Sequence, residues 1–136
     1  MMCGNESKSF KHELRTPVNH IIGYSALLQD TAEEESNTPL AKEAADMHSL
    51  GTELNRVIER MLVCSDHGLQ VEDIQGIKDA VAPLFSRIGM SLASCFDCLQ
   101  DEGAVADLRR IGSAVDRLQS ILDNAVASEC SIEKRY

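Results

Sequence analysis

A short segment near the start of the chain combines a nucleophile, an acid and a hydroxyl group at fixed spacing, in the order Phe10-Lys-His-Glu-Leu-Arg-Thr-Pro17. The neutral imidazole of His12 is a nucleophile near pH 7 and could accept a phosphoryl group, a reaction that depends mostly on positioning and charge stabilisation. Glu13 could hold the imidazole tautomer or take its proton during the attack. On a helix, Thr16 shares a face with His12, where its hydroxyl could orient a water molecule against a phosphoryl group on a partner. The segment therefore predicts phosphoryl transfer or phosphoryl hydrolysis.

An amphipathic helix must carry these side chains. Helical spacing is kept on both sides of Pro17, by Phe10, Leu14, Val18, Ile21, Ser25 and Leu28. A proline inside a helix removes the hydrogen bond to the carbonyl four residues earlier, here that of Glu13, so we expect a bend just beyond His12. The alternative is that Pro17 begins a helix, where proline is also favoured. His12 lies off the apolar stripe, which predicts an exposed ring.

Three further segments show the same helical spacing of apolar residues. The four predicted helices span about 6–31, 39–65, 71–101 and 104–127. The loops between them are predicted from polar and glycine-containing stretches: an acidic loop over 31–39 with Thr38 as an N-cap, a helix end at Ser65-Asp-His-Gly68, and a turn at Asp101-Glu-Gly103. Residues 128–136 are predicted to form a frayed or linking tail.

Amphipathic helices with short connections predict an all-α fold, an antiparallel four-helix bundle. Residues 1–136 are expected to form a single domain made of two helical hairpins, about 6–65 and about 71–127. Aromatic residues make up only 4% of the chain and tryptophan is absent, so aliphatic side chains must fill the core.

Charge and composition exclude several classes of partner. The net charge of −9 argues against nucleic acid and against an anionic membrane surface. No apolar run is long enough for a transmembrane helix and no signal peptide is visible, so we expect a cytoplasmic protein. Cys95-Phe-Asp-Cys98 is a CxxC motif, but it falls within a predicted helix without a second CxxC. We interpret these cysteines as small apolar residues and expect no metal site.

The segment around His12 closely resembles the H-box of sensor histidine kinases, in the dimerisation and histidine-phosphotransfer (HisKA-type) domain. The resemblance continues through Ile21-Ile22-Gly23 and, more loosely, to about Ser65. It implies that His12 is the phosphoacceptor, Glu13 its acid–base partner, and Thr16 a group that assists phosphatase activity.

A docking face for a response-regulator receiver domain is expected around these residues. It would comprise His12, Thr16, Asn19 and Gly23, with the second helix contributing. Lys11 and Arg15 flank the histidine and could stabilise phosphate charge, or they could be ordinary surface charges of a helix.

The second half of the chain shows an internal repeat of the first. Residues 16–25 align without gaps with residues 82–91, and residues 50–56 align with residues 111–117. This alignment puts Lys78, Asp79 and Ala82 in the places of His12, Glu13 and Thr16. Because a lysine amine is protonated at neutral pH, Lys78 cannot replace the imidazole. We therefore expect a degenerate second copy, a pseudo-dimer within one chain, a single active face and a monomer.

Sensor kinases carry an ATP-binding domain after this one, and residues 66–136 contain neither a GxGxxG nor a P-loop motif. The chain is thus not expected to act as an ATP-dependent kinase on its own. The phosphoryl group would come from a phosphorylated receiver, or from a kinase domain in a longer parent protein of which this chain is a fragment. No cofactor is expected in this chain, whereas Mg²⁺ is expected in the receiver.

Three functions fit these observations. The first is a histidine phosphotransfer module of two-component signalling, in which His12 exchanges a phosphoryl group with an aspartate of a receiver. The second is a receiver phosphatase or docking domain that uses Glu13 and Thr16. The third is a non-catalytic interaction bundle attached to an effector domain.

Overall fold

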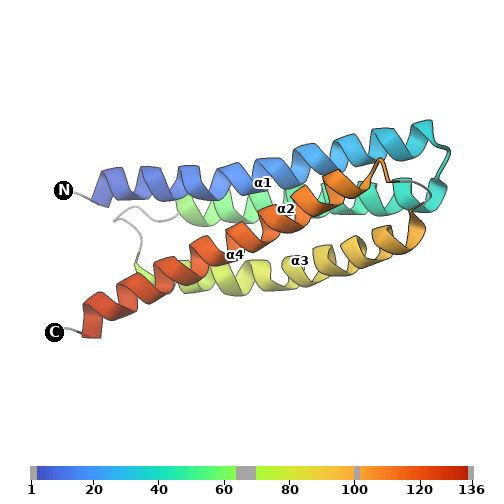
Figure 1. Ribbon diagram of the computed structural model, residues 1–136. Coiled ribbons are helices and arrows are strands. Elements are labelled where there is room, and N and C mark those ends of the chain that lie inside the picture. Colours follow the sequence, from blue (N-terminus) through green and yellow to red (C-terminus); the bar gives the residue numbers. More distant parts are fainter. Residues whose placement is uncertain (1–2, 64–69, 100–101, 135–136) are drawn as a thin grey trace.

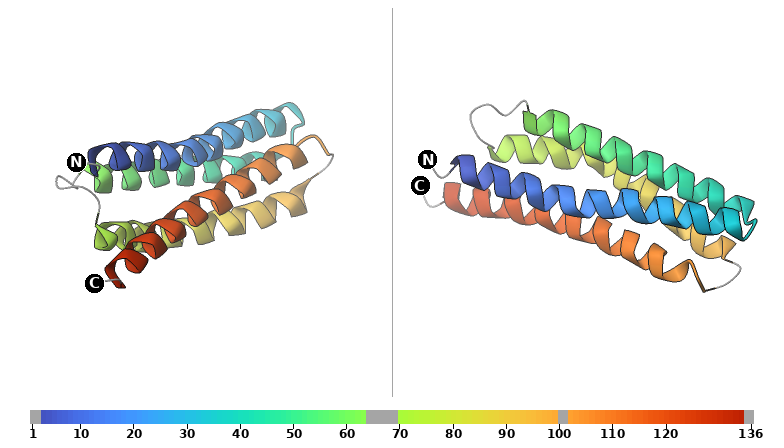
Figure 2. Two further views of the ribbon diagram at one scale, coloured as in Figure 1. Left: turned by 60° about the vertical axis from the view of Figure 1, so that its left-hand side comes forward. Right: turned by 90° about the horizontal axis from the view of Figure 1, so that it is seen from above.

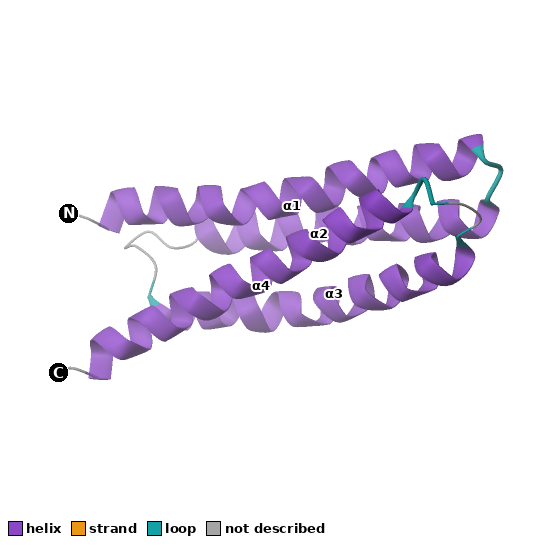
Figure 3. Cartoon of the chain, in the orientation of Figure 1, coloured by secondary structure: helices purple, strands orange, loops and turns teal. Residues whose placement is uncertain are grey.

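The computed structural model describes residues 3–63, 70–99 and 102–134, and these residues form four helices. Their bounds are α1 Cys3–Glu34, α2 Thr38–Val63, α3 Val71–Cys98 and α4 Val105–Lys134 (Figure 1). Within these ranges the chain has no strand, and a short loop joins α1 to α2 (Figure 3). The predicted all-α fold is confirmed.

The helices pack as a four-cornered bundle. α1 contacts α2 and α4, and α3 contacts the same two helices, so α1 and α3 lie at opposite corners (Figure 2). The α1–α2 and α3–α4 loops lie at one end of the bundle, and α1 begins and α4 ends at the other (Figure 1). Neighbouring helices are therefore antiparallel. We call α1 with α2 the first hairpin, and α3 with α4 the second hairpin.

Aliphatic side chains from all four helices fill the space between them. The large side chains that are fully buried include Leu14, Ile21, Leu28, Leu40, Met47, Leu54, Ile58, Leu62, Ile77, Ile88, Leu108 and Ile111. Ser25 is the buried polar residue of the α1 stripe, and its hydroxyl donates to the carbonyl of Ile21 at 2.7 Å. Burial of these apolar faces stabilises the bundle at roughly 25 cal/mol per Å² of apolar surface removed from water.

Helix ends differ from the predicted ones at two places. α1 continues to Glu34, and Asn37 rather than Thr38 caps α2, because the backbone N–H of Leu40 donates to Asn37 Oδ1 at 3.3 Å. Asn37 is only 2% exposed, and its Nδ2 also donates to the carbonyl of Cys98 at 2.9 Å. This side chain therefore joins the start of α2 to the end of α3, which Thr38, one position inside the helix, does not do.

The C-terminal boundaries also need correction. α3 ends at Cys98 because Leu99 adopts an extended conformation with ψ 133°, so the predicted end at 101 is wrong. α4 is helical to Lys134 rather than to 127, and most of the predicted tail therefore belongs to the helix. The predicted helix end at 65–68 and residue Asp101 of the predicted turn lie outside the described residues.

Pro17 lies inside α1, which runs through it without interruption, so the alternative in which it begins a helix is wrong. Pro83 takes an interior position in α3. Each proline leaves one helical carbonyl without its usual N–H donor.

The two hairpins bury residues in the same order. Matching each residue of α1 with the residue of α3 that lies 67 positions later pairs buried residues with buried residues. The pairs are Leu14 with Val81, Pro17 with Leu84, Val18 with Phe85, Ile21 with Ile88, and Leu28 with Cys95. The corresponding pairs of α2 and α4 are Leu40 with Ala104, Ala44 with Leu108, Met47 with Ile111, Leu50 with Ala114, Gly51 with Val115, Leu54 with Leu118, and Ile58 with Leu122.

This common burial pattern corrects the register of the sequence repeat. The gap-free alignment pairs buried Ile21 with exposed Arg87, and exposed Asn19 with buried Phe85. The structural register is shifted by one residue in α1 and α3, where Leu14 matches Val81 rather than Ala80. The alignment followed the identities of proline and glycine, whereas burial follows the apolar stripe that faces the core.

The same correction changes which residue stands in the place of His12. In the structural register this residue is Asp79 rather than Lys78. Ala80 then takes the place of Glu13, and Pro83 takes that of Thr16. In either register the second hairpin has no histidine at this position.

Candidate functional site

The candidate site is the outward face of α1. Residues His12, Asn19 and Gly23 are exposed and Thr16 is half-buried. Steps of four, three and four residues place all four on one face of a helix. A Cβ atom built on Gly23 meets nothing within 4 Å, so this face is open to a partner. The structure thus places the four residues of the predicted docking face, His12 among them, on one side of α1.

The hydroxyl of Thr16 is bound to the backbone of the helix. Its Oγ1 donates to the carbonyl oxygen of His12 at 3.1 Å. In this rotamer the hydroxyl proton is used, and the lone pairs of the oxygen are available to accept a hydrogen bond from water. Thr16 could therefore position a water molecule as an acceptor without changing its rotamer.

Glu13 is exposed beside His12, and no hydrogen bond joins these two described side chains. Both side chains project into solvent, where rotamers change freely. A proton transfer between them therefore requires a rotamer that places the carboxylate within hydrogen-bond distance of the ring.

Arg15 forms an ion pair with α2. Its Nε and Nη2 donate to the two carboxylate oxygens of Glu59 at 2.6 and 3.0 Å. The hydrogen bond from Arg15, together with its charge and that of Lys11, holds the pKa of Glu59 below its usual range against the opposing effect of burial. Arg15 thus ties α1 to α2 next to the candidate site, and both predicted phosphate-binding cations lie near one carboxylate.

The second hairpin repeats this ion pair. Lys78 Nζ lies 2.8 Å from Oδ1 of Asp123. In the structural register Lys78 corresponds to Lys11 and Asp123 corresponds to Glu59, whereas the place of Arg15 is taken by Ala82. A hollow of about 260 Å³ lies beside this pair, lined in part by Ala82, Phe85 and Leu122. The electrostatic link between the two helices is therefore present in both hairpins, without an arginine in the second.

A groove that the sequence did not predict lies between α1 and α4. It has a volume of about 320 Å³, and its polar lining residues are His20, Tyr24, Arg109, Arg110, Ser113 and Arg117. We call these six residues the arginine groove. The available signal in the sequence was the spacing of Arg109, Arg110 and Arg117 along the fourth helix. This spacing does not predict that α4 packs beside α1.

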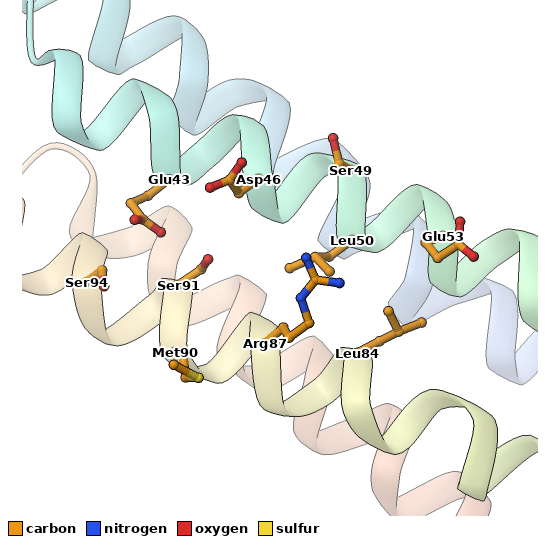
Figure 4. A pocket seen from close by; sticks show the side chains of 10 residues that line it. All are labelled: Glu43, Asp46, Ser49, Leu50, Glu53, Leu84, Arg87, Met90, Ser91 and Ser94. Carbon is orange, nitrogen blue, oxygen red and sulfur yellow. The ribbon is translucent and has the colours of Figure 1, made fainter.

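Another groove, of about 690 Å³, lies between α2 and α3 on the opposite side of the bundle. Its charged residues are mostly acidic: Glu43, Asp46 and Glu53 on α2, with Arg87 on α3 (Figure 4). It contains none of the predicted site residues. The two grooves thus have opposite charge.

Cys95, the first cysteine of the CxxC motif, is fully buried in α3. Burial, with smaller contributions from Glu43 and Cys98, raises the pKa of its thiol to about 12. The thiol is therefore protonated and unreactive at neutral pH, as expected for a cysteine that packs as a small apolar residue.

Within the described ranges, no three His, Cys, Asp or Glu side chains gather in a way that could hold a metal ion. Across the same ranges, no helix is long and apolar enough to cross a membrane.

Comparison with known proteins identifies the first hairpin. Residues 5–69 match the model of the family described as the His Kinase A (phospho-acceptor) domain. No curated protein and no solved structure gives a significant match. The matched residues include the whole candidate face around His12 and end before α3 begins. The first hairpin of this chain is therefore a His Kinase A (phospho-acceptor) domain, a histidine phosphoacceptor domain of two-component signalling.

Proposed function

We propose that this chain is a histidine phosphotransfer module, in which His12 exchanges a phosphoryl group with an aspartate of a receiver domain. The observation that carries the proposal is the exposed position of His12 on an open helix face within the matched residues. Domains of this family work in two-component systems with receiver and ATP-binding partners.

The proposed step balances as a transfer between two partners. The unprotonated ring nitrogen of His12 attacks phosphorus, the nitrogen–phosphorus bond forms, and the bond between phosphorus and the aspartyl oxygen breaks. The receiver recovers its carboxylate, and Glu13 takes the proton from the other ring nitrogen. The reverse sequence returns the phosphoryl group to the receiver, with Mg²⁺ held by the receiver.

Within this proposal the second hairpin takes the structural place of a second subunit, and the chain works as a monomer. The shared burial pattern of the two hairpins and the repeated ion pair support an internal duplication. Because the second hairpin has no histidine at the corresponding position, the module has a single phosphoacceptor.

The test is to incubate the chain with a panel of phosphorylated receiver domains, and to follow acid-labile phosphate and intact mass on both partners. Label on the wild type but not on His12→Ala supports the proposal. If no receiver in the panel labels the wild type, the phosphotransfer proposal is overturned.

A second candidate is a receiver phosphatase, which the position of Thr16 favours. Its hydroxyl lies one helical turn from His12 and can accept a hydrogen bond from a water molecule. Receiver dephosphorylation that survives in His12→Ala but is lost in Thr16→Ala would support this candidate over transfer.

A further inference from the structure

The arginine groove is an unusual surface for this chain. The protein carries a net charge of −9, yet this groove brings three arginines and a histidine together with a single tyrosine and a serine. No carboxylate lines it. A cationic surface on an acidic protein is a place where an anionic partner is attracted while the rest of the molecule repels it.

Two of the arginines are free to bind a partner. Arg109 and Arg117 are exposed and form no ion pair with any described residue. Arg110 is held in place, because its guanidinium lies 5.3 Å from the ring centroid of Tyr24 and its Nη1 lies 3.5 Å from Oδ1 of Asp107. The rings of Tyr24 and His20 are in turn 5.9 Å apart. The groove thus combines two neighbouring aromatic rings, one of them in contact with Arg110, with the guanidinium groups of Arg109 and Arg117, which pair with no described residue.

The groove lies close to the phosphoacceptor. His12 and His20 are both exposed on α1, about 12 Å apart along the axis at about 1.5 Å per residue. A small domain is about 30 Å across, so a partner whose reacting group lies at His12 is large enough to reach the groove as well. The cations nearer to His12, Lys11 and Arg15, already lie close to Glu59.

We propose that the arginine groove is a docking surface for the receiver domain, which would place acidic side chains against Arg109 and Arg117. α4, and hence the second hairpin, would then determine which receiver binds rather than serve only as a scaffold. This inference rests on the proposed phosphotransfer function.

The charge of the transferred group supports this choice of partner. A phosphoryl group carries about −1.5 to −2 charges near pH 7, and the receiver presents it on an aspartate. An anionic reacting surface is steered toward arginines, whose planar guanidinium groups bind carboxylates through paired hydrogen bonds.

The test compares two phosphodonors. Receivers that label the wild type are used with the double variant Arg109→Glu and Arg117→Glu, and His12 is also phosphorylated with phosphoramidate, a small donor that needs no docking. The matched control is the double variant Arg56→Glu and Arg87→Glu, because it makes the same charge change at two exposed arginines on the opposite side, Arg87 in the groove there and Arg56 paired with Glu53 of that groove.

At low ionic strength we expect the variant with Arg109→Glu and Arg117→Glu to lose about tenfold or more in the rate of transfer from the receiver, with an unchanged rate from phosphoramidate. The control should keep its rate within about twofold, and the double variant Arg109→Gln and Arg117→Gln should fall in between. Added salt should narrow the difference, because it screens exposed charges.

Two results would overturn the inference: an unchanged rate of transfer from the receiver in the variant with Arg109→Glu and Arg117→Glu, or an equal loss in the matched control. If the proposed function itself is wrong, the result is different: no receiver labels the wild type. Phosphoramidate labelling of the variant with Arg109→Glu and Arg117→Glu shows that His12 is still presented normally, so misfolding cannot imitate a docking defect.

Discussion

The two hairpins share a scaffold and differ in chemistry. Their buried positions follow the same order along the helices, and an ion pair joins the two helices of each, Arg15 with Glu59 and Lys78 with Asp123. The acidic partners of these two pairs occupy the same structural position. On the exposed face, however, the first hairpin carries His12 where the second carries Asp79. The apolar stripes determine where a helix packs, and exposed residues can change without affecting this packing.

The largest difference expected between the hairpins is in phosphoryl acceptance. His12→Ala should abolish acid-labile phosphate on the chain, because it removes the proposed nucleophile. Asp79→Ala, at the corresponding position of α3, should leave labelling within about twofold of the wild type, since this exposed residue has no nucleophilic ring and accepts a hydrogen bond from Gln75 on its own helix. Labelling of both variants with a phosphorylated receiver measures the contrast, and label that persists in His12→Ala would show that another group accepts the phosphoryl.

Core substitutions test whether the hairpins form one cooperative unit. Ile21 and Ile88 occupy the same structural position and are both fully buried. Each change to alanine should reduce the free energy of unfolding by about 2–5 kcal/mol. Urea denaturation followed by circular dichroism should show one transition in each variant. Two separate transitions would show that the hairpins unfold independently.

Gly51 and Gly112, which the sequence alignment pairs, should change the stability in opposite directions when each is replaced by alanine. A Cβ on Gly51 would meet Ile21 Cγ2 and Ile22 Cγ1 at 3.1 Å, so α1 and α2 approach closely here. Gly51→Ala should cost about 1–3 kcal/mol through overpacking. A Cβ on Gly112 meets nothing within 4 Å, and Gly112→Ala should stabilise by up to about 1 kcal/mol through helix propensity. Thermal denaturation of both variants shows whether each substitution raises or lowers the stability. A change in the same direction at both glycines would favour the sequence alignment that pairs residues 50–56 with residues 111–117.

The smallest expected effect is at the ion pair of the first hairpin. The pKa of Glu59 is lowered in the folded protein, so its contribution to stability is present above the pKa of about 4.3 of an unfolded glutamate and is lost as the pH falls through the lowered value. Glu59→Gln should therefore be less stable than the wild type at pH 7. The loss in free energy of unfolding should be smaller than in Ile21→Ala or Ile88→Ala.

Urea denaturation at pH 7 and pH 3 checks this pH dependence. The difference in free energy of unfolding between Glu59→Gln and the wild type should be smaller at pH 3 than at pH 7. A gap that stays constant over this range would show that the carboxylate charge is not the source of the stabilisation.

The fold and the face around His12 could be predicted because both depend on spacing within one helix. The repeat of Leu14, Val18 and Ile21 fixes the buried side of α1, and His12 is then exposed on the other side. This argument needs no knowledge of the other helices.

What the sequence did not predict depends on contacts between distant residues. Asn37 caps α2 and also binds the carbonyl of Cys98, and neighbouring Thr38 is an equally good cap by type. The arginine groove requires α4 to lie beside Tyr24 of α1, which spacing within α4 cannot show. The register of the repeat was wrong because the alignment followed identities such as Gly51 with Gly112, whose surroundings differ, whereas packing follows the apolar stripes.

Because Cys95 is buried, its reaction with an alkylating reagent reports on the transient separation of α3 from the bundle. Thiolates react with alkylating reagents and thiols do not, and this thiol has a pKa of about 12 in the core of α3. Its modification therefore requires α3 to separate transiently from the bundle. The rate of alkylation at Cys95 would follow the opening of the second hairpin directly, in the way that amide hydrogen exchange follows local unfolding. Docking of a receiver on the bundle would then be measurable as slower alkylation at a site it never touches.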